Sequence, residues 1–366
     1  MRTRSLILTL ALPLLPAGIW DGERPATGRC EHAIGGSAEH AIVSDLIAHD
    51  YGVRERDLTK LCEGNIITGT LPTTDKHQMT LIGIVRLEAT SARFAHYAER
   101  VEQLVATDHV VEVGQIDVSD LQNTLLSYPV MLDDVREVPS CEVGDCDIKL
   151  PQHIVLELAQ LDHDADGLDG EVAVVIRRWL QQYLTGYESE GNAALVEYSD
   201  KSPPQSLQQG FNQLLADAQV LAYRNPRLYD YFDGVVDRLP QDMSESFVWS
   251  VEEFGMRPLT TVTHTVVHRD SIGDMAGVWV GMKLLYASHY LHASLRQMRL
   301  IEDRSSDEPA SYLVCVDRLL FDAKVGGIKR AMVKRRLRSH LADRLEEIRD
   351  LLSASGLTAE DGSEGL

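Results

Sequence analysis

The stretch VWVGMKLLYASHYLHASLRQMRLI, residues 278–301, decides the fold class, because apolar and polar side chains alternate along its centre. Alternation with a period of two is typical of a β-strand that buries one face. It places one imidazole, that of His289, in an otherwise apolar row of Leu285, Ala287, Leu291, Ala293 and Leu295. The opposite row is aromatic and polar: Tyr286, Ser288, Tyr290, His292, Ser294 and Arg296. His289 is therefore the first candidate for a binding residue.

Similar β-rich runs surround this stretch, at residues 244–255, 257–269 and 311–321. Short loops containing Gly and Asp join them, and consecutive strands with tight connections predict an antiparallel sheet. The N-terminal part adds three β-rich runs, at 66–71, 79–89 and 109–118. One run with helical periodicity, at 91–106, lies between the second and the third.

An amphipathic helix is predicted over residues 326–352, and residues 119–242 are predicted to be helical and charged. The apolar stripe of the last helix is expected to comprise Ile328, Met332, Leu337, Leu341, Leu345, Ile348 and Leu352. The predicted fold is α+β, with an antiparallel sheet gripped by a long C-terminal helix and with a large helical insertion. The expected segments are 1–18 (signal peptide), 19–65 (N-terminal segment), 66–118 and 243–353 (sheet domain), 119–242 (insertion) and 354–366 (disordered tail).

Charge and the N-terminus indicate the compartment and the class of partner. Arg2 and Arg4 precede an apolar run from Leu6 to Trp20 that contains two prolines, which is typical of a cleaved export signal; an uncleaved anchor is the alternative. We expect an exported, periplasmic protein. With 56 acidic and 35 basic residues and a net charge of −21, the chain lacks the basic footprint that nucleic acid requires.

The five cysteines are interpreted in the light of export, because thiols pair in an oxidising compartment. Cys141 and Cys146 flank a short turn and predict a small disulfide loop, and Cys30 with Cys62 can close a second one. Cys315 lies in an apolar run and is expected to be a buried, inert thiol. A redox or metal role for the 141–146 pair is the alternative, although the spacing matches neither pattern.

The predicted order of elements is a strand, a helix opened by ATSARF (89–94), further strands and a long final helix. This order resembles the helix-grip arrangement of START-like lipid-binding domains. The likeness covers 66–118 and 243–353 and makes 119–242 an insertion. It implies an antiparallel sheet gripped by the last helix and a lipid ligand. CEVGDCDIKLP (141–151) and LYASHYLHASL (285–295) also resemble segments of exported bacterial proteins.

Histidines supply the remaining chemistry of the predicted sheet. His264 and His268 lie on one face of one strand, ~13 Å apart, which is too far for one metal ion. His264 and His289 on neighbouring strands can converge, with Glu252 or Glu253 as a third group. Core histidines bonded to neighbours are the structural alternative. Because no catalytic motif accompanies them, we expect no cofactor and no metal site.

The string LDHDADGLDGE (161–171) matches only the first half of a calcium loop, because position twelve falls on Ala173. An acidic helix N-terminus explains the same residues. In the last helix, a basic cluster is a candidate for docking on an anionic membrane: Lys329, Arg330, Lys334, Arg335, Arg336 and Arg338.

The sequence thus indicates a binding protein for an apolar small molecule or lipid, held between the sheet and the last helix. His264, His289, Tyr286 and Tyr290 are the expected ligand-binding residues. A histidine-based hydrolase or oxidoreductase, with or without a metal ion, is the first alternative, and a helical scaffold that binds a protein partner is the second.

Overall fold

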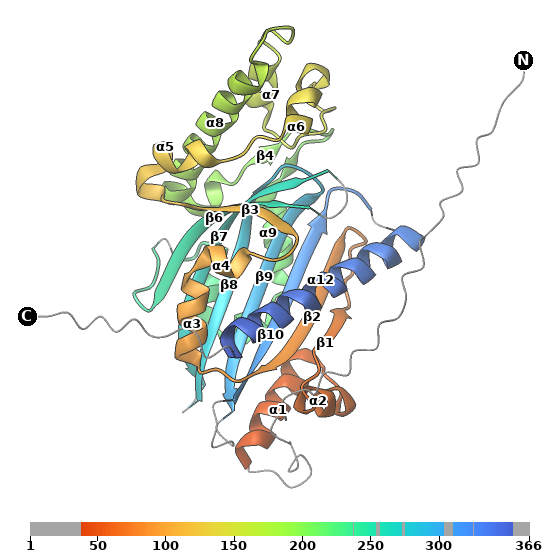
Figure 1. Ribbon diagram of the computed structural model, residues 1–366, viewed down its shortest axis with the longest axis vertical. Coiled ribbons are helices and arrows are strands. Elements are labelled where there is room, and N and C mark those ends of the chain that lie inside the picture. The colour runs from red at the N-terminus through yellow and green to blue at the C-terminus, as the bar shows by residue number, and fades with distance from the viewer. Residues whose placement is uncertain are drawn as a thin grey trace, which may run out of the picture.

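The computed structural model describes residues 38–353 except 237, 254–256, 273–274, 304–309 and 325 (Figure 1). The expected signal peptide, the expected disordered tail and Cys30 lie outside the described residues.

An eight-stranded sheet forms the centre of the molecule, in the order β1-β2-β10-β9-β8-β7-β6-β3. All its neighbouring strands pair antiparallel. The strands are β1 (Ile67–Leu71), β2 (Gln78–Leu87), β3 (Val110–Ile116), β6 (Met243–Glu252), β7 (Leu259–Ile272), β8 (Met275–Ala287), β9 (Leu291–Asp303) and β10 (Ala310–Phe321). Two short strands, β4 (Glu197–Tyr198) and β5 (Gln205–Ser206), pair separately. The predicted antiparallel sheet is confirmed.

The α-helices of the described residues fall into three groups and one long C-terminal helix along the chain. The first precedes β1 and comprises α1 (Ala38–Tyr51) and α2 (Glu55–Cys62). The second connects β2 to β3 and comprises α3 (Ser91–Glu99) and α4 (Val101–Val105). The insertion between β3 and β6 holds α5 (Leu121–Thr124), α6 (Leu132–Glu137), α7 (Gln152–Leu158), α8 (Leu168–Glu190), α9 (Leu207–Ala216), α10 (Gln219–Arg224) and α11 (Pro226–Asp233). The chain then closes with the 27-residue α12 (Gly327–Ser353), as predicted.

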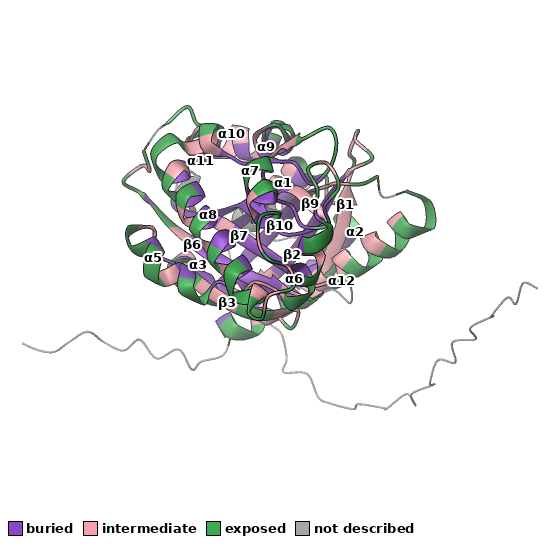
Figure 2. Cartoon of the chain, turned by 90° about the horizontal axis from the view of Figure 1, so that it is seen from above, coloured by how far each residue is buried: buried purple, intermediate pink, exposed green. Residues whose placement is uncertain are grey.

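One face of the sheet is covered by α3, α4 and the second half of α12 (Figures 1 and 2). The contact is close at Gly83 of β2, where an added Cβ would lie 2.6 Å from Leu345 Cδ1. Strand side chains from the alternate positions of β2, β8 and β9 form a buried apolar layer with Phe94, Leu345 and Ile348. This layer is the core that fixes α12 on the sheet.

The helical insertion covers the opposite face, so that the sheet is buried on both sides (Figure 2). Burial of both faces explains why β2 is buried at nearly every position and why its apolar residues do not alternate with polar ones. On this second face α8 and α9 pack against β6–β9, whereas α1 and α2 cover Ile82, Ile84 and Val314 nearer the β1 edge. No helix in the part of the chain that the structure describes is long and apolar enough to span a bilayer.

Two local expectations from the sequence are wrong. Residues 288–290 do not continue a strand: β8 ends at Ala287, β9 begins at Leu291, and Tyr290 has a φ of 60° in the turn between them. His289 therefore has no place in a strand face. In α12, Ile328 and Met332 do not join the buried stripe but are 83% and 67% exposed. The fully buried stripe starts at Leu341, whereas Val333 and Leu337 nearer the start of the helix are only partly buried against the same core.

Candidate functional site

The expected ligand-binding residues lie on the insertion side of the sheet rather than beneath α12. His264 contacts Tyr187 of α8, Tyr286 packs edge-on against Trp179 of the same helix, and His289 contacts α6. Tyr290 occupies the β8–β9 turn, with its ring 5.6 Å from that of His289. A site between the sheet and α12 would therefore not include these residues.

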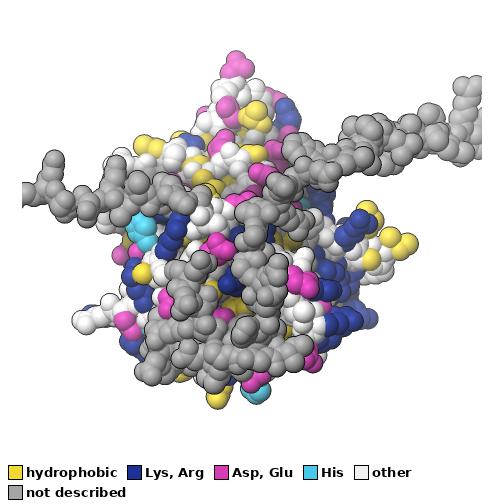
Figure 3. Space-filling model, turned by 60° about the horizontal axis from the view of Figure 1, so that its bottom comes forward, with side chains coloured by type: hydrophobic (Ala, Val, Ile, Leu, Met, Phe, Trp, Pro, Cys, Tyr) yellow, Lys and Arg dark blue, Asp and Glu magenta, His cyan; other side chains and the backbone are white. Residues whose placement is uncertain are grey.

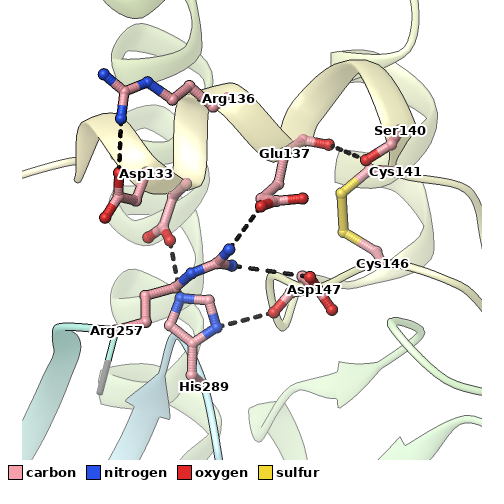
Figure 4. Close-up of polar contacts among 10 residues, drawn as sticks. Asp133, Arg136, Glu137, Ser140, Cys141, Cys146, Asp147, Arg257 and His289 are labelled. Carbon is pink, nitrogen blue, oxygen red and sulfur yellow. Dashed lines mark hydrogen bonds and ion pairs between the residues drawn. A yellow bond between two sulfur atoms is a disulfide. The ribbon is translucent and has the colours of Figure 1, made fainter. Parts of the chain in front are cut away.

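His289 joins the β8–β9 turn to the insertion (Figure 4). Its Nδ1 lies 2.8 Å from the Asp147 carbonyl oxygen, and its Nε2 lies 2.8 Å from Asp134 Oδ1. The carbonyl can only accept, so Nδ1 is the donor there. The His289 and Asp134 side chains are only 5% and 6% exposed. This buried pair links the β8–β9 turn to α6. The link explains why a single imidazole, that of His289, occurs among the apolar residues of this stretch.

A second set of polar contacts surrounds the His289 pair. Arg257 donates to Glu137 at 2.6 Å and lies 4.0 Å from a carboxylate oxygen of Asp147 (Figure 4). The disulfide Cys141–Cys146 closes the loop that leads to Asp147, and this predicted disulfide is confirmed. The insertion is thus held against the sheet by several charged contacts close together.

His264 on β7 forms the centre of another buried chain of hydrogen bonds. Its Nδ1 lies 3.0 Å from the Tyr187 hydroxyl and its Nε2 lies 2.8 Å from Glu245 Oε2 on β6. Burial lowers the pKa of His264, although Glu245 opposes this. Burial would raise the pKa of Glu245, but the hydrogen bonds from His264 and Tyr231 outweigh it and lower that pKa. Phe247 stacks on the imidazole with ring centroids 4.4 Å apart.

Lys283 is the cross-strand neighbour of His264. It is 1% exposed, its Nζ lies 4.3 Å from the centre of the Phe211 ring, and it donates to Asn192 Oδ1. Burial lowers the pKa of Lys283 to about 7. A lysine without a carboxylate partner in an apolar setting loses its charge more readily than one in water.

The two histidines expected to converge have separate partners. His264 bonds to Glu245 and His289 to Asp134, and neither bonds to Glu252 or Glu253. Among the described residues, no group of three or more His, Cys, Asp or Glu side chains could hold a metal ion.

A cleft at the edge of the insertion was not anticipated from the sequence. Its volume is about 480 Å³, and its walls come from the first turn of α3, the loop before β6, α11 and the far ends of β7 and β8. The lining residues are Ser91, Ala92, Arg227, Asp242, His268, Arg269, Asp270, Gly277 and Val278. The sequence placed His268 beside His264 on one strand face, but it gave no sign that α3 and α11 meet there.

Charged groups of both signs line this cleft. His268 lies 3.1 Å from Asp242 Oδ2 through its Nε2 and contacts the Asn225 side chain through Nδ1. Arg227 makes an ion pair with the same Asp242 carboxylate. The pKa of Asp242 is lowered, because the hydrogen bonds of its own backbone amide, Arg227 and His268 outweigh the effect of burial. Arg269 is exposed and reaches Glu99 at 2.8 Å.

The remaining candidates lie apart from these sites. Cys315 is buried in β10, where burial raises its pKa, as expected for an inert thiol. Cys62 Sγ lies 3.8 Å from the Tyr312 hydroxyl. Residues 162–167 lead into α8, whose N-cap is Gly167 rather than an Asp side chain, and Asp169 and Glu171 lie in its first turn. These residues thus occupy the acidic helix N-terminus that was the alternative to a calcium loop.

In comparisons with known proteins, no family model, no curated protein and no solved structure matches this chain.

Proposed function

We propose that this protein binds a small polar molecule in the cleft between α3, α11 and the ends of β7 and β8. The observation that carries the proposal is the cleft itself, whose volume of about 480 Å³ falls within the range of small-molecule sites. Export to the periplasm, as the N-terminus indicates, suits a binding protein of this kind.

The lining supports a polar ligand rather than a hydrocarbon chain. Arg269, whose exposed guanidinium pairs with Glu99, lines the cleft together with the carboxylates of Asp242 and Asp270. His268 is held in place by Asp242 and Asn225, so it presents a fixed ring. A ligand with both donors and acceptors, such as a zwitterion, would match walls of mixed sign.

The lipid cargo that the sequence indicated remains the alternative. Its support is the START-like likeness: β2, the pair α3–α4, then β3 and β6–β10 in one antiparallel sheet, then α12. Against it stands the close contact of Leu345 with Gly83. The enzyme alternative has less support, because Tyr187 and His264 are enclosed and already bonded to each other.

A thermal-shift screen of the full chain tests the proposal. One panel contains small polar molecules (amino acids, dipeptides and sugar phosphates), and the other contains fatty acids and lysophospholipids. A ligand present at 100 times its Kd stabilises the folded state by about 2.7 kcal/mol, which is readily measured. Ala92→Trp fills the cleft from an exposed position on α3, and Ala216→Trp is the matched change at an exposed position on α9.

We expect a polar molecule to stabilise the wild type and Ala216→Trp but not Ala92→Trp. Arg269→Met should weaken the same binding. Equal stabilisation of all variants by a polar molecule contradicts the cleft as the site. Stabilisation by lipids alone, unchanged in Ala92→Trp, supports the START-like alternative instead.

A further inference from the structure

The first half of α12 projects past β1, the edge strand of the sheet, and leaves one side open to solvent (Figure 1). The buried residues of the helix begin only at Leu341. The tip, defined here as residues 328–338, packs on the core only through the partly buried Val333 and Leu337.

The tip carries two large apolar side chains on its outward face. Ile328 and Met332 are four residues apart and thus lie on the same side of the helix. That side faces away from the stripe of Leu341, Leu345 and Ile348 that packs on the sheet. Core packing therefore does not explain why these two positions are apolar.

Cations surround this apolar pair. Lys329, Arg335 and Arg336 are exposed beside it, and Lys334 is partly exposed. Figure 3 shows the dark blue Lys and Arg side chains gathered on the side where the helix projects, with hydrophobic side chains beyond them. Arg330 and Arg338 do not belong to this group of cations. They donate to backbone oxygens of Gln78 and Thr68 and so anchor the helix to β2 and β1.

Among the described residues, no ion pair balances the exposed cations of the tip. No Asp or Glu occurs from residue 323 to residue 342, although the chain carries 56 acidic residues. In the described part of the structure, Lys329, Lys334, Arg335 and Arg336 form no ion pair. Cations at the start of a helix are also unfavourable, because that end of the helix dipole is positive. These observations indicate an anionic partner outside the chain.

We propose that residues 328–338 dock on the surface of an anionic bilayer, with Ile328 and Met332 among the acyl chains and Lys329, Arg335 and Arg336 at the lipid phosphates. An apolar strip flanked by cations is the pattern of helices that lie in the membrane interface. A bilayer is favoured over nucleic acid because the apolar pair would gain nothing from a phosphate backbone. This surface shares no residue with the cleft, so its test is independent of the proposed function.

Flotation of the full chain with lipid vesicles tests the proposal. One vesicle type contains phosphatidylcholine alone, and the other adds phosphatidylglycerol to about a third of the lipid. The variants are Lys329→Glu/Arg335→Glu/Arg336→Glu and Ile328→Ser/Met332→Ser. The matched control, Arg56→Glu/Lys201→Glu/Lys60→Glu, reverses three exposed cations elsewhere. Thermal unfolding checks that every variant is folded.

We expect wild type and control to bind the anionic vesicles only, and 0.5 M NaCl to weaken this binding. Each cation near the surface contributes about fivefold to binding, so the tip charge reversal should weaken it by at least about 100-fold. The serine variant should weaken it about tenfold or more. The proposal is overturned by equal binding to both vesicle types, by unchanged binding of either tip variant, or by binding of an RNA oligonucleotide instead of vesicles.

Discussion

The two faces of the sheet are held to their helices by different means. Beneath α12, side chains from alternating strand positions meet Leu341, Leu345 and Ile348 in an apolar layer. Beneath the insertion, the apolar core is interrupted by three buried histidines, each bonded to its own carboxylate. Apolar contact permits many partners, whereas a buried hydrogen-bonding group requires a partner at one position. The insertion is thus held by histidine–carboxylate contacts, whereas the polar contacts of α12 are arginine hydrogen bonds to backbone carbonyl oxygens.

Removing one partner of a polar contact on the insertion face should lower the free energy of unfolding. The protein loses far more stability when a buried group loses its hydrogen-bond partner than when an exposed group does, because water cannot replace the buried partner. The apolar face responds instead to changes of volume. Three sets of substitutions separate these responses.

The largest effect is expected at the His289–Asp134 pair. Asp134→Ala leaves the His289 ring buried without its carboxylate, and we expect a loss of about 4 kcal/mol in the free energy of unfolding, measured with urea. His289→Ala should lose a similar amount. The double variant should lose clearly less than the sum, since the second change removes a group that is already unpaired. If the loss in the double variant equals the sum of the two single losses, the pair does not hold the insertion on the sheet.

A somewhat smaller effect is expected where α12 crosses β2. Gly83→Val places a side chain where Leu345 and Leu341 already lie, and overpacking of this kind destabilises by about 3 kcal/mol. Gly170→Ala is the control, because a Cβ there meets nothing within 4 Å and alanine favours the helix. Tolerance of valine at position 83 would mean that the α12 face holds free space, as a lipid site there requires.

The smallest effect concerns Lys283 and appears as a dependence on pH. Its folded-state pKa of about 7 is below the ordinary 10.5, so between these values the unfolded chain binds more protons. Stability should therefore rise with pH, by about 2 kcal/mol from pH 7 to pH 9. Lys283→Met should lack this part of the rise. Urea unfolding at pH 7, 8 and 9 measures it, and parallel curves for the two proteins would be the contrary result.

The same contrast explains what could be predicted from the sequence. Alternating strand positions and the long amphipathic helix were sufficient for the sheet and α12, because both depend on local periodicity. The position of His289 was missed because its partners lie 142 and 155 residues away, and no period connects them. Ile328 was placed in the buried stripe because periodicity does not show where the sheet ends beneath the helix. The cleft was missed because α3, α11, the loop before β6 and the ends of β7 and β8, some of them far apart in sequence, form it together.

Hydrogen exchange with and without the ligand found in the screen tests most directly whether the space for a ligand lies at the insertion edge or beneath α12. We expect the ligand to slow exchange at residues 91–94 and 266–269, in α3 and β7, while exchange at 79–87 and 341–352 stays unchanged. Slower exchange in β2 and α12, with none in α3 and β7, would contradict the proposed cleft and place the ligand between the sheet and its last helix.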